Sequence, residues 1–393
     1  MGSLGWSHLT PEDREAILRG IADGEAYGGP YHVEIHPVDR CNVDGSFCAT
    51  AALRGTDEAP LPRFTEMLGE LREAGTRSLR LSGGGEPLLH RRIHDFLQAI
   101  VASRLPVENL TTNGVLLAGE VREVLVAVCD QITVSLNTGD EATYAAMMRT
   151  TPRNLHRVVD NVRGLLAARD GRRRRRESTP RVHLQFLVHK GNYRTIPGMY
   201  ELARGLGVDS IAWNGLAFLA PQDKMTAAEI DEMRGLYEEV VQVDRQASLL
   251  RGQSLLPVEP IGGAVSPPLS GMPPAKETFD DLCLIGWHSM VVRATGGVAP
   301  CGMLQGKDLG NVYRQSVHRV WHGEAYRRFR AELTRILRRR LRWEHDPELD
   351  RTVEPLCGPC GGCPIASPYG NDLRFRRSFQ ATLERLAHAP AVH

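Results

Sequence analysis

Between residues 32 and 213, short apolar strand patterns alternate with longer amphipathic helix patterns, and this alternation predicts an α/β fold. Six strand–helix pairs in a row imply parallel strands that are joined by right-handed crossovers. Six units are too few for a closed eightfold barrel, so we expect a partial, TIM-like (βα)6 barrel. A group of cysteines near the C-terminus predicts a small cysteine-rich domain after the barrel.

The expected strands and helices follow one another regularly along the chain. Thr10, Pro11 and the acids at 12 and 13 are typical of a helix start, and this first helix runs towards Gly24. Thr226 and Glu229 have the spacing of a capping box and begin a helix through about residue 243. The strands are expected at 32–35, 78–81, 131–137, 182–188 and 210–213, with a strand end and turn at 109–114, and the other helices at 63–74, 94–103, from 120, 155–168 and 196–206.

The domain boundaries follow from changes in composition. Residues 253–277 are rich in Pro, Gly and Ser and are predicted to form a linker. We therefore expect an N-terminal helix at 1–30, the barrel at 31–225, a helix and linker at 226–280, the cysteine-rich domain at 281–370 and a C-terminal helix at 371–393. The arginine run at 172–176 is expected to be a solvated loop between two elements.

The overall charge and hydropathy exclude several classes of partner. The formal net charge is +1, which gives no electrostatic argument for nucleic acid or for an anionic membrane. The N-terminus lacks a basic segment followed by an apolar run, and no apolar run is long enough to span a bilayer. We therefore expect a cytoplasmic protein without nucleic-acid or membrane partners.

Seven of the eight cysteines fall into two groups, which in a cytosolic chain favours metal or redox chemistry over disulfides. Cys129 lies alone in an apolar run and is predicted to be a buried structural thiol. In the first group, Cys41 and Cys48 follow the strand at 32–35, and Phe47 directly precedes the second thiol. The next expected strand ends in Gly84-Gly85-Glu86-Pro87. In parallel α/β folds, ligands bind outside such carboxyl ends of strands.

This arrangement resembles the radical S-adenosylmethionine (SAM) enzymes, whose cluster loop reads C-x3-C-x2-C with an aromatic residue before the last Cys. The resemblance implies a [4Fe–4S] cluster at Cys41 and Cys48, SAM bound to its open iron, and reductive cleavage of SAM to a 5′-deoxyadenosyl radical. Gly84, Gly85 and Glu86 resemble the GGEP segment that binds the SAM amino group. The other cofactor-binding residues that the resemblance implies are Phe47, Asn113, Ser135, Asn137 and Gln185.

The middle position of the cluster loop is Gly45, which has no side chain and cannot bind iron. Three interpretations are open. An oxygen of Asp44 or Ser46 can take the place, although oxygen matches a soft cluster poorly. The cluster can be partial or unstable, with weak or absent SAM cleavage. Alternatively, the sequence carries a substitution of a parent that has Cys there.

The second cysteine group contains a C-x12-G-x4-C segment with Gly296 at the fixed position, followed by a C-x2-C-x2-C segment. It resembles the SPASM and shorter twitch extensions of radical SAM enzymes, which hold auxiliary iron–sulfur clusters. Five thiols are enough for one auxiliary [4Fe–4S] cluster. The resemblance implies Cys283, Cys301 and Cys357 with Cys360 or Cys363 as ligands. A structural zinc site with the same thiols is the competing interpretation.

The resemblance covers residues 31–365 and implies an enzyme. Peptide-modifying relatives often carry a leader-binding domain before the barrel; only a short helix precedes it here, so we expect a small-molecule substrate. Twitch-bearing relatives oxidise or epimerise carbinol positions of aminocyclitols and aminoglycosides in antibiotic biosynthesis. We expect an oxidoreductase or epimerase of this type, with an external flavodoxin or ferredoxin as electron donor. The alternatives are a catalytically impaired iron–sulfur partner or electron carrier, and a zinc-binding interaction module.

Overall fold

The strands of the chain form one curved sheet. The computed structural model describes residues 8–48, 50–51, 54–215, 225–244, 249–250, 285–302 and 308–341. Within them, the strand order is β6-β5-β4-β3-β2-β1-β7-β8, and every neighbouring pair is parallel except β7 with β8. The predicted α/β fold with a parallel sheet is therefore confirmed. The strands are β1 (His32–Ile35), β2 (Ser78–Leu81), β3 (Val107–Thr112), β4 (Gln131–Ser135), β5 (Arg181–Val188), β6 (Ser210–Gly215), β7 (Ser289–Val292) and β8 (Val298–Ala299).

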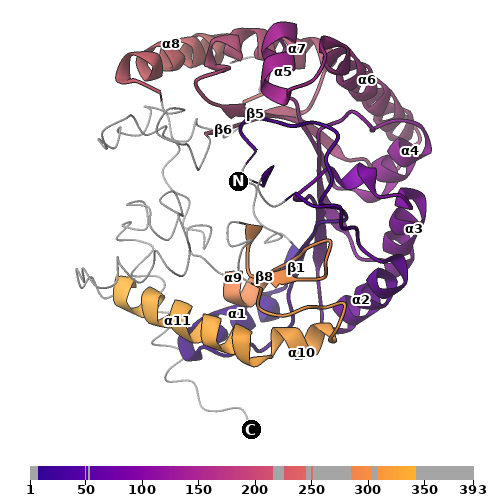
Figure 1. Cartoon of the computed structure of the whole chain (residues 1–393), viewed down its shortest axis with the longest axis vertical. Helices are drawn as coiled ribbons and strands as arrows, with labels where there is room; N and C mark the ends of the chain where they lie inside the picture. Colours follow the sequence, from indigo (N-terminus) through magenta and orange to yellow (C-terminus); the bar gives the residue numbers. More distant parts are fainter. Residues whose placement is uncertain are drawn as a thin grey trace.

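Helices α2 to α8 surround the outer side of this sheet (Figure 1). Among the described residues, the helices are α1 (Pro11–Asp23), α2 (Leu61–Glu73), α3 (Ile93–Ser103), α4 (Gly119–Val128), α5 (Glu141–Met148), α6 (Pro152–Arg174), α7 (Ile196–Leu206), α8 (Ala227–Asp244), α9 (Ile285–His288), α10 (Val317–Trp321) and α11 (Glu324–Leu341), with short 3-10 turns η3 (Pro87–Leu89) and η4 (Tyr193–Thr195). Thr10 and Asp13 form a capping box at the start of α1, and Gly24 ends the helix in the left-handed conformation, as the sequence predicts. None of these described helices is long and apolar enough to cross a membrane.

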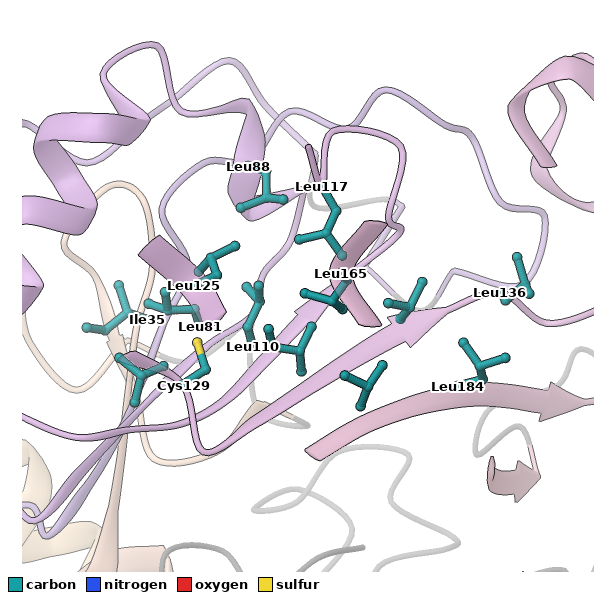
Figure 2. Packing of buried hydrophobic residues seen from close by; sticks show 14 of the residues in the cluster. Ile35, Leu81, Leu88, Leu110, Leu117, Leu125, Cys129, Leu136, Leu165 and Leu184 are labelled. Atoms are coloured by element: carbon teal, nitrogen blue, oxygen red, sulfur yellow. The ribbon is translucent and has the colours of Figure 1, made fainter. Parts of the chain in front are cut away.

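The two faces of the sheet differ in character because strand side chains alternate. Along the strands, every second residue is apolar and fully buried under the outer helices. Figure 2 shows Ile35, Leu81, Leu110 and Leu184 in this core, together with the thiol of Cys129. Each such side chain contributes about 1.5–3 kcal/mol when it is fully buried. The opposite face, which we call the inner face, carries mostly polar side chains.

Cys129 is 5% exposed, and burial raises the pKa of its thiol. The prediction of a buried structural thiol is confirmed.

Two features differ from the sequence expectations or were absent from them, and a third expectation is not tested. The arginine run was expected to be a loop, but Arg172–Arg174 form the last turn of α6. Arginine is a good helix former, and the run is stabilised there by ion pairs of Arg172 with Glu177 and of Arg173 with Asp170. No sequence pattern predicted helix α5. The predicted linker at 253–277 lies outside the described residues.

The C-terminal segment joins the barrel sheet directly, because β7 pairs in parallel with β1. The β7–β8 hairpin turns at Gly296, whose φ is +80°, and a Cβ there would lie 2.4 Å from the ring of Tyr313. Arg63 of α2 donates to the carbonyls of Val312 and Gln315 at 2.7 and 3.1 Å. The hairpin and the segment after it are thus fixed against the first strand–helix unit.

The turn geometry predicts a large cost for a single methyl group at position 296. Gly296→Ala should lower the free energy of unfolding by about 1–3 kcal/mol, because alanine disfavours a positive φ and meets the Tyr313 ring. Gly69→Ala is the matched control. Position 69 lies inside α2, and a Cβ added there would have no atom outside the helix's own backbone within 4 Å, so the change should stabilise the protein by about 0.5–1 kcal/mol. Urea unfolding measures both changes, and equal effects would contradict the assignment of the turn.

Candidate cofactor site

The two thiols of the first group lie on the loop that follows β1. Two backbone hydrogen bonds hold this loop to the end of α5: Ser46 N donates to Met147 O at 2.9 Å, and Asp44 N donates to Met148 O at 3.1 Å. The helix that the sequence did not predict therefore positions the cysteine loop.

The glycine turn after β2 packs directly against this loop. The backbone N–H of Glu86 donates to the carbonyl of Arg40 at 2.8 Å. A Cβ on Gly85 would lie 1.9 Å from that carbonyl oxygen, so only glycine fits there. The residue before Cys41 and the predicted SAM-binding turn thus form one unit.

The carboxylate of Glu86 holds the end of β3 in place. It is 2% exposed and accepts hydrogen bonds from Thr112 Oγ1 at 2.7 Å, Asn113 N at 2.8 Å and Leu88 N at 3.2 Å. Burial raises the pKa of Glu86, although these donors oppose the shift. In this structure the Glu86 carboxylate positions its neighbours through hydrogen bonds.

Asn113 connects β3 to the cysteine loop. Its side-chain amide donates to Asn42 Oδ1 at 2.7 Å and lies 3.8 Å from Cys41 Sγ. The structure therefore brings together Cys41, the glycine turn and Asn113, which the sequence assigned to one site.

The remaining predicted residues lie on β4 and β5. Ser135 and Gln185 are register partners on these strands. Asn137 is fully buried with φ +65°, and its side chain accepts from Leu187 N at 2.9 Å and donates to Ser135 Oγ at 3.3 Å. Asn137 therefore stabilises the junction of the two strands.

Phe47 lies near the carboxyl end of β5, because its ring centroid is 5.4 Å from that of His189, the residue after this strand. The cysteine loop thereby reaches across the carboxyl ends of the strands.

Two side chains that the sequence patterns did not identify lie beside Cys48. Its Sγ is 3.2 Å from Thr50 Oγ1, which in turn donates to the Gly84 carbonyl at 3.1 Å. Burial raises the pKa of the Cys48 thiol, but hydrogen bonds from Thr50 and Arg54 outweigh burial, and the pKa lies below its ordinary value. At Cys41, burial dominates and raises the pKa. No spacing rule identifies Arg54, whose position depends on how the loop folds.

The donor set fits an iron–sulfur cluster only in part. Two thiols are present, but Gly45 offers none. The Asp44 carboxylate is bound by Arg54 and Arg149, each at 2.9 Å, and hydrogen bonding to Arg149 lowers its pKa. The two arginines therefore already bind the Asp44 oxygens that would have to replace the missing thiolate. An added Cβ on Gly45 would meet only ordinary contacts, 3.6 Å from Phe47 and 3.8 Å from Met148. A Cβ at position 45 therefore requires no change of the backbone.

Of the second cysteine group, the structure describes only Cys301, which is half-buried just past β8. The other predicted ligands, Cys283, Cys357, Cys360 and Cys363, lie outside the described residues. Among the residues that are described, no group of three or more His, Cys, Asp or Glu side chains could hold a metal ion.

Comparison with known proteins identifies the family. Residues 35–169 match the family model of the radical SAM superfamily, and residues 283–364 match that of the SPASM iron–sulfur cluster-binding domain. The chain belongs to the radical SAM superfamily. It contains a radical SAM domain followed by a C-terminal SPASM domain. Membership implies SAM and a [4Fe–4S] cluster as cofactors, and the SPASM domain implies additional iron–sulfur clusters.

Curated relatives match only part of the chain. A GTP 3′,8-cyclase of Erythrobacter litoralis (strain HTCC2594) is 28% identical over 186 residues, which are 45% of this chain and 52% of the relative. A GTP 3′,8-cyclase of Mycobacterium sp. (strain KMS) is 37% identical over 140 residues, 34% of this chain and 38% of the relative. The chain spans about half or less of these relatives' length.

Solved structures share the fold at low sequence identity. Streptococcus suis SuiB bound to S-adenosylmethionine superimposes with a TM-score of 0.58 at 18% identity, over 77% of this chain and 68% of SuiB. The anSMEcpe structure with bound AdoMet and Cp18Cys peptide gives a TM-score of 0.54 at 14% identity, over 91% of this chain and 97% of that one.

Because the Glu86 carboxylate is buried and hydrogen-bonded, replacing one of its oxygens should lower the free energy of unfolding. Glu86→Gln replaces one carboxylate oxygen by an NH2 group, which then faces either the Asn113 N–H or the donors of Thr112 and Leu88, and should cost about 1–3 kcal/mol. Glu66→Gln is the control, because this exposed side chain pairs with Arg63 at the surface, and the change should cost under about 1 kcal/mol. Chemical denaturation measures the free energy of unfolding of both variants. An unchanged value for Glu86→Gln would contradict the hydrogen-bond network.

The space at position 45 predicts a gain of iron. After anaerobic reconstitution, Gly45→Cys should retain the iron and sulfide of its [4Fe–4S] cluster more fully than the unmodified protein, because it completes the thiolate set. Ser46→Cys adds a thiol one residue away and should give no such gain. Equal iron in all three proteins would contradict the incomplete donor set.

Proposed function

We propose that the chain uses radical SAM chemistry to oxidise or epimerise a carbinol or similar C–H position of a polar small molecule, of the aminocyclitol or aminoglycoside type. An external flavodoxin or ferredoxin is the proposed electron donor. The observation that carries the proposal is the polar inner face of the sheet. It continues from the cofactor site at the carboxyl ends of the strands and suits a ligand rich in hydroxyl and amino groups.

Hydrogen-bonding side chains line the inner face across several strands. Asn109 of β3 donates to Thr133 of β4 at 3.1 Å, and Arg80 of β2 donates to Thr111 at 3.4 Å. Asn109, Arg80 and Thr111 are half-buried, whereas Thr133 is buried; the three half-buried side chains still have hydrogen-bonding capacity beyond these contacts. Such a surface favours a ligand that offers many donors and acceptors over an apolar one.

The inner face also holds charges of both signs. Glu34 lies 3.0 Å from His36 Nε2. Burial raises the pKa of Glu34, but Arg80, His36 and His32 outweigh it and bring the pKa down to about 2. A carboxylate and a guanidinium near each other match amino and hydroxyl groups in one ligand.

The chain's own residues have separable roles in this proposal. When bound, SAM and the reduced cluster supply a 5′-deoxyadenosyl radical that removes a hydrogen atom. Cys41 and Cys48 are the proposed cluster ligands, and Gly84, Gly85, Asn113, Ser135 and Gln185 the proposed SAM contacts. Glu86 and Asn137 fix the strand ends that carry those contacts, and Arg80 and Glu34 orient the substrate.

The test is anaerobic turnover with SAM, a chemical reductant and aminocyclitols such as 2-deoxystreptamine. 5′-Deoxyadenosine and a product changed by one oxidation or one inversion are expected. Arg80→Met should raise the KM for the substrate about 10-fold or more while SAM cleavage persists, because it removes a charge-assisted hydrogen bond. Arg92→Met, at an exposed pair with Asp95, is the control and should change neither. Failure to form 5′-deoxyadenosine above a cluster-free sample would count against the proposal.

Gly45 favours a second candidate, a catalytically impaired relative that acts as an iron–sulfur partner or electron carrier. The missing thiolate is the observation in its favour. If 5′-deoxyadenosine forms only with Gly45→Cys, this second candidate describes the chain. A zinc-binding module is a third candidate, and zinc instead of iron in metal analysis would support it.

A further inference from the structure

A row of polar residues lies at the amino-terminal edge of the inner face, at the opposite end of the strands from the cofactor site. His32 of β1 is in register with Ser78 of β2 on one side and with Ser289 of β7 on the other. His32 is 3% exposed. The function proposed above assigns no chemistry to this row.

A bulge in β3 brings a carboxylate to this row. Leu79 pairs with Val107 and Arg80 with Asn109, so Glu108 is an additional residue between the two pairs. Bulges re-aim side chains and are frequent beside active sites. Here, Glu108 and Asn109 are both half-buried, while Val107 and Leu110 on either side of them are fully buried in the core.

Glu108 and Ser78 hold one nitrogen of the His32 ring. His32 Nδ1 lies 3.2 Å from Glu108 Oε2 and 2.9 Å from Ser78 Oγ, and Ser78 Oγ donates to Glu108 at 3.3 Å. A carboxylate accepts only, so the proton of the neutral ring is held on Nδ1. Nε2 then carries the lone pair.

The Nε2 atom of His32 is buried and has no hydrogen-bond partner among the described residues. Buried polar atoms are nearly always paired, and an exception calls for an explanation. A carboxylate on Nδ1 with a lone pair on Nε2 is the arrangement of a histidine general base.

A second histidine and several charged groups surround the ring. The His288 ring of α9 stacks on His32 with centroids 5.9 Å apart and planes at 13°. Burial and the neighbouring His32 lower the pKa of His288 to about 3, so His288 stays neutral. The charged groups near the His32 ring are the carboxylates of Glu108 and Glu34, and the guanidinium of Arg80 lies near Glu34.

We infer that His32 is the proton acceptor of the reaction and that Glu108 is its positioning residue. Nε2 takes a proton from a hydroxyl or ammonium group of the substrate: the O–H or N–H bond breaks, its electron pair stays on the substrate atom, and an Nε2–H bond forms. This inference rests on the proposed function. From His32 to Ile35 the strand covers about 10 Å, so a molecule of one or two six-membered rings spans the inner face.

The first test needs no substrate. Nitrogen NMR of the whole chain with labelled histidine, with His32 assigned from the spectrum of His32→Gln, reports which ring nitrogen holds the proton. We expect Nδ1–H with bare Nε2 at pH 7.5. Glu108→Gln should increase the share of rings that carry the proton on Nε2, because the amide of glutamine can donate to Nδ1, and Glu108→Asp should restore Nδ1–H, because a carboxylate only accepts. A proton on Nε2 at pH 7.5, or an unchanged proton position in Glu108→Gln, would overturn the assignment.

The second test uses 2-deoxystreptamine as the probe, with calorimetry and the same NMR signals. We expect it to shift the Nε2 resonance of His32 and to bind His32→Gln about 10-fold more weakly than the unmodified chain. His94→Gln, a side chain 55% exposed on α3, is the control and should bind normally. Binding that leaves the His32 signal unmoved overturns the inference alone. If the probe does not bind at all, the proposed substrate class fails, and the proton position from the first test decides on His32.

Discussion

The contact between the Gly85 backbone and the Arg40 carbonyl is the constraint on which the cofactor site depends. The two segments come from successive strand ends and approach so closely that a single methyl group would lie 1.9 Å from the oxygen. The Glu86 carboxylate joins the glycine turn to the end of β3 by accepting from the Asn113 N–H, and the Asn113 side-chain amide lies 3.8 Å from Cys41 Sγ. Three loops that are distant in sequence thus form one rigid site at the carboxyl ends of the strands.

The two-sided sheet explains how the remainder of the fold serves this site. Its outer face is apolar and packs under the helices, which fixes the strand ends to which the loops are attached (Figure 1). Its inner face keeps charged and amide groups partly available, with the candidate cofactor residues at one end and His32 with Glu108 at the other. β7 continues the sheet beside β1, and the thiol of Cys301 lies just past β8.

Local patterns were sufficient where the physics is local. The capping box of α1, the strand–helix alternation and the glycine turn follow from neighbouring residues. The pairing of β7 with β1 joins residues more than 250 positions apart, and no local periodicity contains it. Thr50 and Arg54 reach Cys48 only because the loop folds back, and Glu108 reaches His32 only because of a bulge. Sequence motifs therefore predicted residues that the structure brings together, such as Cys41, Gly85 and Asn113, but not the side chains that set their electrostatics.

Binding of SAM to the anaerobically reconstituted protein tests the central claim most directly. Equilibrium binding to the unmodified chain and to Gly85→Val compares a site with and without the close contact. We predict one bound SAM per chain for the first and none for the second, because valine forces the glycine turn away from Arg40. Equal SAM binding by both proteins, or none by the unmodified chain, would contradict the account.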